Sequence, residues 1–384
     1  MNKKNIAGGK VVRRFHNFGT AAAPAILQPV FVVPDAEAGD TVLSFQWDQP
    51  HLTATTYARL KAGQSPSLAV GAESDLDLVF FDAKGHVIRN CPPGVSRGIT
   101  CQFTGDPNIG GDAVDLVELY FSGPPKSAQV DGQLFFIAIV LNEGPDRGVV
   151  KYSWFDFQGI LGVVDFATNS GTSFGHSNAA GNQVIGAASW YVTQPFSTSG
   201  LVPPNDTFLT PAIDLSPCAP ACLNDFSSAG GIPIYFDRFG NRLATPQIRQ
   251  VPSVTGPDGG NTSFFLSDSS YDDDDGDGFN SPVSIFITPP DSNPADEYPN
   301  FFGTSASAPH VAAVAALMLE KNPSLTVQQI RTILQQTARP ISLRFTSDRP
   351  TITFPIEDIG AGGVSFDAGF GLVDAAAALQ AVGN

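Results

Sequence analysis

Residues 301–318 read FFGTSASAPHVAAVAALM, a Gly-Thr-Ser turn that leads directly into a run of small and aliphatic residues. The run predicts a helix that begins close to Ser305, with Pro309 early enough to lie in its first turn. Unpaired backbone N–H groups and the positive end of the helix dipole meet at such a helix start, and both stabilise an oxyanion beside the hydroxyl. Because alanines occupy all sides of the helix, we expect it to be closely packed and buried.

The same stretch carries a recognisable motif. Gly303, Thr304 and Ser305 are followed by three further residues and then by Pro309 and His310. This arrangement resembles the serine motif of the subtilisin-like peptidases, or subtilases. The resemblance implies that Ser305 is the nucleophile and that the other four residues support it, with His310 a helix histidine and not the catalytic base. Ser-Ala-Ser-Ala-Pro also resembles the sedolisins, in which glutamate replaces the histidine base, but a histidine directly after the proline favours the subtilisin-like family. The alternative is a turn that caps an ordinary buried helix.

Length and composition indicate a globular protein with room for two domains. The chain has 384 residues, of which 42% are hydrophobic, so each domain can bury a sizeable core. The formal net charge is −16 with only 21 lysines and arginines, which disfavours a nucleic-acid partner. No segment approaches the roughly 18 apolar residues of a membrane span. Acidic, glycine-rich chains with little lysine are common among secreted bacterial proteins, so we expect a secreted or extracellular protein.

The N-terminal residues do not read as an export signal. Residues 1–10 carry charges and no apolar core, so they are not a signal peptide. A chain of secreted character without such a signal predicts that its natural beginning is missing, and we expect residues 1–14 to be disordered or truncated.

The four cysteines fall in two local pairs, Cys91 with Cys101 and Cys218 with Cys222. Four cysteines allow three disulfide connectivities, and proximity in sequence favours the local one. A zinc site is the competing interpretation, but the sequence has no CxxC pair and no histidine near either cysteine pair. Two disulfides would suit an oxidising compartment.

Residues 15–157 predict an all-β domain. Short runs of β-branched and aromatic residues alternate there with Gly, Pro, Asp and Asn, and their spacing predicts a β-sandwich. The clearest candidate strands are Pro29–Val33, Thr41–Trp47, Asp77–Phe81, Leu116–Tyr120 and Leu134–Val140. Their succession resembles the β-sandwich modules attached to, or inserted in, bacterial subtilisin-like peptidases. The resemblance makes Asp75, Asp77 and Asp112 candidate calcium ligands, although solvated turn residues are the alternative that we favour.

Residues 158–384 change to an α/β pattern and resemble the C-terminal half of a subtilisin-like peptidase domain. The matching segments are a family strand at Val184–Ala188, a Phe-Ser-Ser turn within Asn224–Gly231, a Pro- and Gly-containing stretch at Gln250–Asn261 and a closing signature at Phe366–Val382. The resemblance implies a partial parallel sheet with helices, preceded by the all-β sandwich domain.

Four residues in this region depart from the family pattern or imitate it. Val251 and Ser253 stand where the family has Lys and Asp, so an ion pair that supports the site is lost. His176 and Asn182 resemble catalytic residues but lie in a linker of the family pattern, so we assign neither a catalytic role.

A second helix is predicted after the serine helix. Thr326 with Gln329 reads as a capping box, and Leu325 with Ile330 as its hydrophobic staple. Ile330, Ile333 and Leu334 share one face of this helix.

The acidic run Tyr271–Gly278 could bind calcium. Asp273, Asp275 and Asp277 alternate there beside a turn glycine, which is what oxygen ligation of calcium needs. The twelfth position of the run is Ser284 and not glutamate, so the run is not an EF-hand. A structural calcium is one interpretation and a solvated loop is the other. The serine chemistry itself requires no cofactor.

The residues that would activate Ser305 are not found. A hydroxyl at its ordinary pKa is a weak nucleophile and needs a base, with a further group to orient that base. The family takes its aspartate from an Asp-Ser/Thr-Gly motif and its histidine from an HG[TS] motif, and neither motif occurs in the sequence. The five histidines are His16, His51, His86, His176 and His310, none of them followed by Gly-Thr or Gly-Ser.

Two functions therefore remain open. In the first, the chain is the C-terminal part of a serine endopeptidase that acts on polypeptide substrates, has little activity alone and needs a missing N-terminal catalytic half as its partner. In the second, the chain is a non-catalytic relative that works as a secreted binding or adhesion module. The intact serine motif favours the first, because a remnant would be free to lose its nucleophile.

Overall fold

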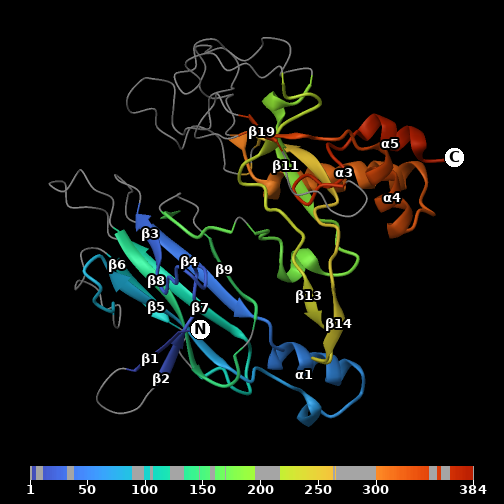
Figure 1. The fold of residues 1–384 in the computed structure, drawn as a ribbon. Coiled ribbons are helices and arrows are strands. Elements are labelled where there is room, and N and C mark those ends of the chain that lie inside the picture. The colour runs from blue at the N-terminus through green and yellow to red at the C-terminus, as the bar shows by residue number, and fades with distance from the viewer. Residues whose placement is uncertain are drawn as a thin grey trace. The chain divides into compact units, whose positions relative to one another are not determined.

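The computed structural model describes residues 2–5, 12–32, 39–88, 99–103, 107–121, 134–146, 148–155, 161–168, 170–194, 217–262, 264, 300–345, 353–355 and 364–383. The chain divides into two compact units (Figure 1). The first unit comprises Met1–Asn169 together with Ile234–Gln247, and the second comprises Ser170–Pro233 with Ile248–Asn384. The chain thus leaves the first unit, returns to it for one short segment and leaves it again.

The first unit contains two antiparallel sheets. One sheet has the order β1 (Asn2–Asn5), β2 (Val12–Phe15), β8 (Leu134–Glu143), β3 (Gln28–Val32) and β10 (Leu161–Val163), with β5 (Asp75–Asp82) also paired to β8. The other has the order β6 (Ile99–Phe103), β7 (Val114–Phe121), β4 (Gly39–Trp47) and β9 (Val150–Phe155). The unit is completed by helix α1 (Leu52–Lys61), the short helix η1 (Pro66–Leu68) and a hairpin of β13 (Ile234–Phe236) and β14 (Arg242–Gln247).

Side chains from both sheets meet in one hydrophobic core. Along β5 every second side chain is buried, namely Leu76, Leu78 and Phe80, because successive residues of a strand point to opposite faces. Phe45 of β4 and Ile137 of β8 belong to the same core. The five strands expected from the sequence in this region are present as β3, β4, β5, β7 and β8. Two further strands, β1 and β2, include residues of the segment 1–14, for which the sequence predicts disorder or truncation.

The acidic residues of the first unit bond to protein groups. Asp112 accepts hydrogen bonds from the backbone N–H and the hydroxyl of Thr53, at 2.8 and 2.7 Å. It therefore caps the start of α1, whose own N-cap residue makes no side-chain cap. Asp75 and Asp77 both accept from the side-chain amide of Asn142.

A buried carboxyl on β7 predicts a pH dependence of stability. Burial raises the pKa of Asp115 to about 7, against a hydrogen bond from Asn108, and the charges of Asp77 and Asp75 raise it further. A folded-state pKa above the unfolded value means that the folded state binds more protons between about pH 4 and pH 7, so this contribution to stability is lost as the pH rises through 7.

Asp115→Asn should remove the loss of folding stability that wild type suffers as the pH rises through 7. We expect wild type and variant to be equally stable at pH 4.5, and the variant to be more stable at pH 8 by on the order of 2 kcal/mol after solvent screening. Hydrogen exchange of peptides from β5 and β7 measures the difference, with Glu118→Gln on the same strand as the control. Identical pH dependence in Asp115→Asn and wild type would contradict the prediction.

The second unit contains parallel strand pairs with helices packed on them. Strand β11 (Ile185–Ser189) pairs in parallel with β15 (Val254–Asp258), and β12 (Leu223–Asn224) in parallel with β18 (Leu343–Phe345). Antiparallel pairs join β18 to β19 (Thr353–Pro355) and β16 (Gly260–Asn261) to β17 (Asn300–Phe301). The helices are α3 (Thr304–Lys321), α4 (Val327–Thr337), α5 (Ala375–Ala381), η2 (Gly175–Asn178) and η3 (Trp190–Val192). The whole structure is therefore mixed α/β, as the sequence indicates.

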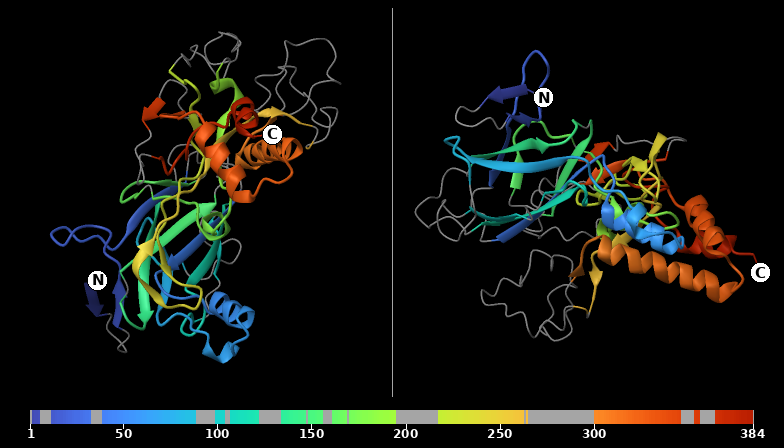
Figure 2. Two further views of the ribbon diagram at one scale, coloured as in Figure 1. Left: turned by 90° about the vertical axis from the view of Figure 1, so that its right-hand side faces the viewer. Right: turned by 90° about the horizontal axis from the view of Figure 1, so that it is seen from below.

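Helix α3 is a long, single helix, drawn in orange in Figure 2, and it packs on β11 and β15. Two expectations about it were wrong. The helix is buried on one face only: Val311, Val314 and Met318 are buried, whereas Leu317 is 46% exposed. Alanine is small enough for the sheet to pack closely against one face, and it tolerates exposure to solvent on the other. Pro309 lies in the second turn, since the helix begins at Thr304; without an N–H, it leaves the carbonyl of Ser305 without its helical partner.

Local sequence signals elsewhere in the second unit are confirmed. Thr326 and Gln329 form the capping box at the start of α4. Leu325 and Ile330 pack into the same hydrophobic cluster, and Leu334 is buried there. Cys218 and Cys222 form a disulfide, so zinc is excluded for that pair. Cys91, and with it the predicted bridge to Cys101, lies outside the described residues.

Candidate active site

Ser305 lies in the first turn of α3 and is exposed. The residue before the helix, Gly303, has φ +121°, a conformation that side-chain-bearing residues rarely adopt, so glycine is required at this turn. The first intrahelical hydrogen bonds run from the N–H groups of Ala306 and Ser307 to the carbonyl of Gly303, at 2.9 and 3.2 Å. The N–H groups of Thr304 and Ser305 precede them and face the helix start, where a developing negative charge would be stabilised.

A buried carboxylate accepts a hydrogen bond from the backbone of this turn. Asp258, the last residue of β15, accepts a hydrogen bond from the backbone N–H of Gly303 at 2.7 Å. Asn224 donates its side-chain amide to both carboxylate oxygens of Asp258, at 3.0 and 3.1 Å. The amide oxygen of Asn224 in turn accepts from the backbone and the hydroxyl of Ser189. Burial raises the pKa of Asp258, while the hydrogen bonds from Gly303, Asn224 and Ser189 and the charge of His310 lower it.

This network connects the sheet to the nucleophile. Ser189 and Asp258 are the paired last residues of the parallel strands β11 and β15, so the network lies at the carboxyl edge of these strands. That edge is where open parallel sheets bind their ligands. A carboxylate beside the start of α3 also interacts favourably with the helix dipole. The arrangement fixes the position of Gly303 and, through it, the first turn that carries Ser305.

Sequence reasoning missed Asp258 and Asn224. The stretch around Asp258 was interpreted only through Pro257 and Gly259, and Asn224 only as part of a turn. Each residue ends a buried strand, Val254–Asp258 or Leu223–Asn224, but the sequences VTGPD and LN carry no clear apolar pattern that would have revealed this. Nothing local indicates that the two residues, which are 34 positions apart, form a pair.

No base is brought to Ser305 by the part of the chain that the structure describes. There the Ser305 hydroxyl has no hydrogen-bond partner, although all five histidines are included. His310 directs Nδ1 to the carbonyl of Ala306 at 2.8 Å, one turn back on its own helix. His176 lies in η2, where its carbonyl accepts from the side chain of Asn182. The other three histidines belong to the first unit.

Val251 and Ser253, where the resemblance implies a supporting ion pair, are both buried. Ser253, at the position where the aspartate was expected, is completely buried, and its hydroxyl has no hydrogen-bond partner. Val251, at the position of the lysine, is also buried. Neither side chain can form an ion pair, because valine is apolar and serine is uncharged.

Metal ligation is not visible in the resolved portions of the chain. Among the described residues, no three histidine, cysteine, aspartate or glutamate side chains are arranged to hold a metal ion. Asp273, Asp275 and Asp277 lie outside those residues, so calcium at that run stays a prediction. No helix within the described ranges has both the length and the apolar character to span a bilayer.

Comparisons with known proteins agree with the serine motif. The family model described as the subtilase family matches residues 278–371. Alkaline elastase YaB of Bacillus sp. (strain YaB) is 53% identical over 45 residues, 12% of this chain and 12% of the elastase. Subtilisin DY of Bacillus licheniformis is 43% identical over 56 residues, 15% of this chain and 19% of the subtilisin. Furin-like protease 1 of Drosophila melanogaster (isoform 1-CRR) is 38% identical over 82 residues, 21% of this chain and 7% of that protease.

The chain therefore matches less than a fifth of the length of each of these relatives. The matches are short, yet the family model includes the turn at Gly303, the exposed Ser305 and the whole of α3. The segment 278–371, which contains Ser305 and the whole of its helix, matches the subtilase family and is similar to proteins named as subtilisin-like peptidases.

Proposed function

We propose that the chain carries the nucleophile of a serine-type endopeptidase, with Ser305 attacking the carbonyl carbon of a peptide bond. The Ser305 proton passes to a base, the amine leaves with a proton, and water then hydrolyses the acyl-enzyme to regenerate the hydroxyl. The observation that carries the proposal is an exposed serine in the first turn of a long helix, within the subtilase-family segment. The substrate would be a polypeptide.

The neighbouring residues have distinct proposed roles. The N–H of Ser305 is a candidate donor to the oxyanion, because it lies at the positive end of α3. Gly303 and Thr304 shape the turn, and Pro309 frees the Ser305 carbonyl from the helical hydrogen-bond pattern. His310 is bonded to the carbonyl of Ala306, which supports a structural role. Asp258 and Asn224 act on the turn and not on the substrate.

The base and its orienting acid are proposed to come from polypeptide beyond the described residues, such as a partner that supplies the N-terminal catalytic half. Two observations support this: the Ser305 hydroxyl lacks a partner in the described structure, and the outer face of α3 exposes Leu317 and Leu319. Loss of triad members leaves only about 10³ to 10⁴ over the uncatalysed rate. The chain alone should therefore be close to inert toward peptides.

An activated ester tests the nucleophile separately from the base. Incubation with p-nitrophenyl acetate at pH 9 should acetylate Ser305, detected by mass spectrometry of tryptic peptides, because a good leaving group reduces the need for general-base help. Ser305→Ala should abolish this acetylation. Ser307→Ala is the matched control, since Ser307 is completely buried one half-turn away and its hydroxyl has no partner; we expect acetylation as in wild type and equal or higher stability.

Either of two results would overturn the proposal. Equal acetylation of the same peptide in Ser305→Ala would exclude Ser305 as the nucleophile. Rapid labelling of Ser305 by a fluorophosphonate at pH 7 in the purified chain would exclude the proposed absence of a base.

A second candidate is a non-catalytic, secreted binding module. The observation in its favour is the first unit, whose two antiparallel sheets share a core of their own and which we propose to be a β-sandwich module. The Cys218–Cys222 disulfide supports secretion into an oxidising compartment for both candidates. Absence of acetylation at Ser305 would favour this second candidate.

A further inference from the structure

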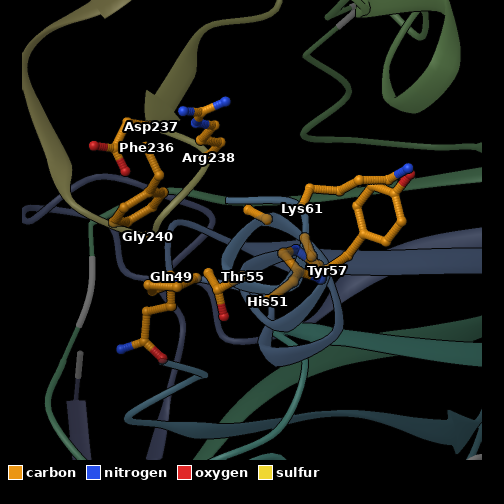
Figure 3. A pocket seen from close by; sticks show the side chains of 12 residues that line it. Gln49, His51, Thr55, Tyr57, Lys61, Phe236, Asp237, Arg238 and Gly240 are labelled. Carbon is orange, nitrogen blue, oxygen red and sulfur yellow. The ribbon is translucent and has the colours of Figure 1, made fainter. Parts of the chain in front are cut away.

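The first unit has a pocket of about 460 Å³ between helix α1 and the β13–β14 hairpin (Figure 3). Its walls are held together by three contacts. Gly240, with φ +84°, approaches Thr55 and Pro50 so closely that a side chain at this position would collide with them. The guanidinium of Arg59 lies 4.6 Å from the ring centre of Phe239, and Arg242 forms an ion pair of 2.7 Å with the buried Asp48. These contacts preform the pocket.

The pocket combines an apolar surface with two cations, Lys61 and Arg238, which lie over the rings of Tyr57 and Phe239 respectively. Phe236 and Tyr57 line it together with small aliphatic side chains of α1. Lys61 and Arg238 lie on opposite walls of it, one from the helix and one from the hairpin. In the part of the chain that the structure describes, neither forms an ion pair with a carboxylate. Two such cations in one pocket are notable in a chain of net charge −16.

The charged side chains that line the pocket, apart from a histidine, are two cations, Lys61 and Arg238, and one carboxylate, Asp237, so the cations are in excess. Asp237 also lines it, but its carboxylate accepts hydrogen bonds from the N–H groups of Phe239 and Asn241 and from the Asn241 side chain, all within its own turn. These bonds lower the pKa of Asp237 and keep its oxygens engaged. Burial lowers the pKa of His51, against the charge of Asp112, which disfavours a third cation at the pocket.

Helices α1 and η1 also expose large apolar side chains. Tyr57 is 61% exposed and Leu60 56% exposed, both on α1, and Leu68 of η1 is exposed as well. Large apolar side chains that gather beside a pocket are typical of an interaction surface for a polypeptide. Cations at the pocket select a partner with negative charge.

We propose that this pocket binds an acidic polypeptide segment in which a large apolar side chain is flanked by carboxylates. The apolar side chain enters between Phe236 and the α1 alanines, and the flanking carboxylates pair with Lys61 and Arg238. This interaction is independent of the reaction proposed for Ser305.

Calorimetric titration of the full chain with the peptide acetyl-Gly-Asp-Phe-Asp-Gly-amide tests the proposal. We expect a Kd on the order of 100 µM at low salt. The same peptide with Lys in place of Asp should bind at least about tenfold more weakly, and so should the peptide with Gly in place of Phe. Phenylpropionate serves as a probe for a site that takes only small carboxylates.

Four variants separate the pocket from general charge effects. Lys61→Glu and Arg238→Glu should each weaken binding of the acidic peptide about tenfold, whereas Lys84→Glu, an exposed lysine in a distant turn of the same unit, should change it less than about twofold. Ala54→Trp fills the pocket from an exposed helix position and should abolish binding while circular dichroism stays unchanged. Equal binding of the lysine peptide, equal weakening by Lys84→Glu, or binding of phenylpropionate alone would overturn the proposal.

Discussion

Replacing Asp258 with alanine should destabilise the second unit by about 2–6 kcal/mol, because it leaves two hydrogen-bond donors, the Asn224 amide and the Gly303 N–H, without their acceptor. Asn224 would lose both acceptors of its side-chain amide, and the half-buried N–H of Gly303 would lose its acceptor. Each buried donor left without a partner costs about 1–3 kcal/mol. Losing these hydrogen bonds should loosen the turn before Ser305 and also lower the free energy of unfolding.

Hydrogen exchange followed by mass spectrometry is suited to this prediction, because it reports the two units separately. Peptides from β15 and the start of α3 should exchange faster in Asp258→Ala, while peptides from β4 and β8 keep their wild-type rates. Asp258→Asn should be milder, since it keeps an acceptor for Gly303 and loses only part of the bonding to Asn224. Glu320→Ala, an exposed acidic residue of α3, is the control for charge. Unchanged exchange in Asp258→Ala would contradict the role assigned to the network.

Replacing Gly256 with valine should displace α3 from the sheet at a cost of about 3 kcal/mol. A side chain at Gly256 would lie 2.8 Å from the carbonyl oxygen of Ser307 and 3.0 Å from Val311. Both residues belong to the buried face of α3, so the helix has to move outward, and the position of Ser305 moves with it. Acetylation of Ser305 by the activated ester should therefore fall together with stability.

Gly260→Val is the matched control for this substitution. Gly260 lies four residues further along the chain in β16, has ordinary backbone angles, and a side chain there meets no atom within 4 Å. We expect its denaturation midpoint and its acetylation rate to equal those of wild type. If the two valine variants behaved alike, close packing of α3 on β15 would not be what positions the nucleophile.

The sequence was informative wherever the determining interactions are local. The strands of the first unit were predicted because short runs of β-branched and aromatic residues, bounded by Gly, Pro, Asp and Asn, are visible within each strand. The capping box of Thr326 and Gln329 and the disulfide of Cys218 and Cys222 each span only a few residues. The start of the serine helix was predicted from the Gly-Thr-Ser turn, and α3 does begin at Thr304.

Features that depend on remote partners escaped prediction. Helix α1 lies in a region of strands, and its N-terminus is capped by Asp112, which is 59 positions after Thr53. The Asp258 network needs Asn224 from another strand. The burial of α3 depends on what covers each face, which its own composition does not contain. The same holds for the hairpin of β13 and β14, which the sequence pattern grouped with residues 158–384 and which the structure places in the first unit.

That hairpin sets the order in which the molecule can be made. A ribosome finishes residues 1–169 well before it adds Ile234–Gln247, which at ~5–20 residues per second is a delay of seconds. During that interval the nascent first unit lacks the wall that carries Phe236, Arg238 and Gly240, so α1 has nothing to pack against on that side. The order of translation thus determines when the pocket can form. A gene cut at residue 169 would encode a first unit without the β13–β14 hairpin, and that unit could not form the pocket.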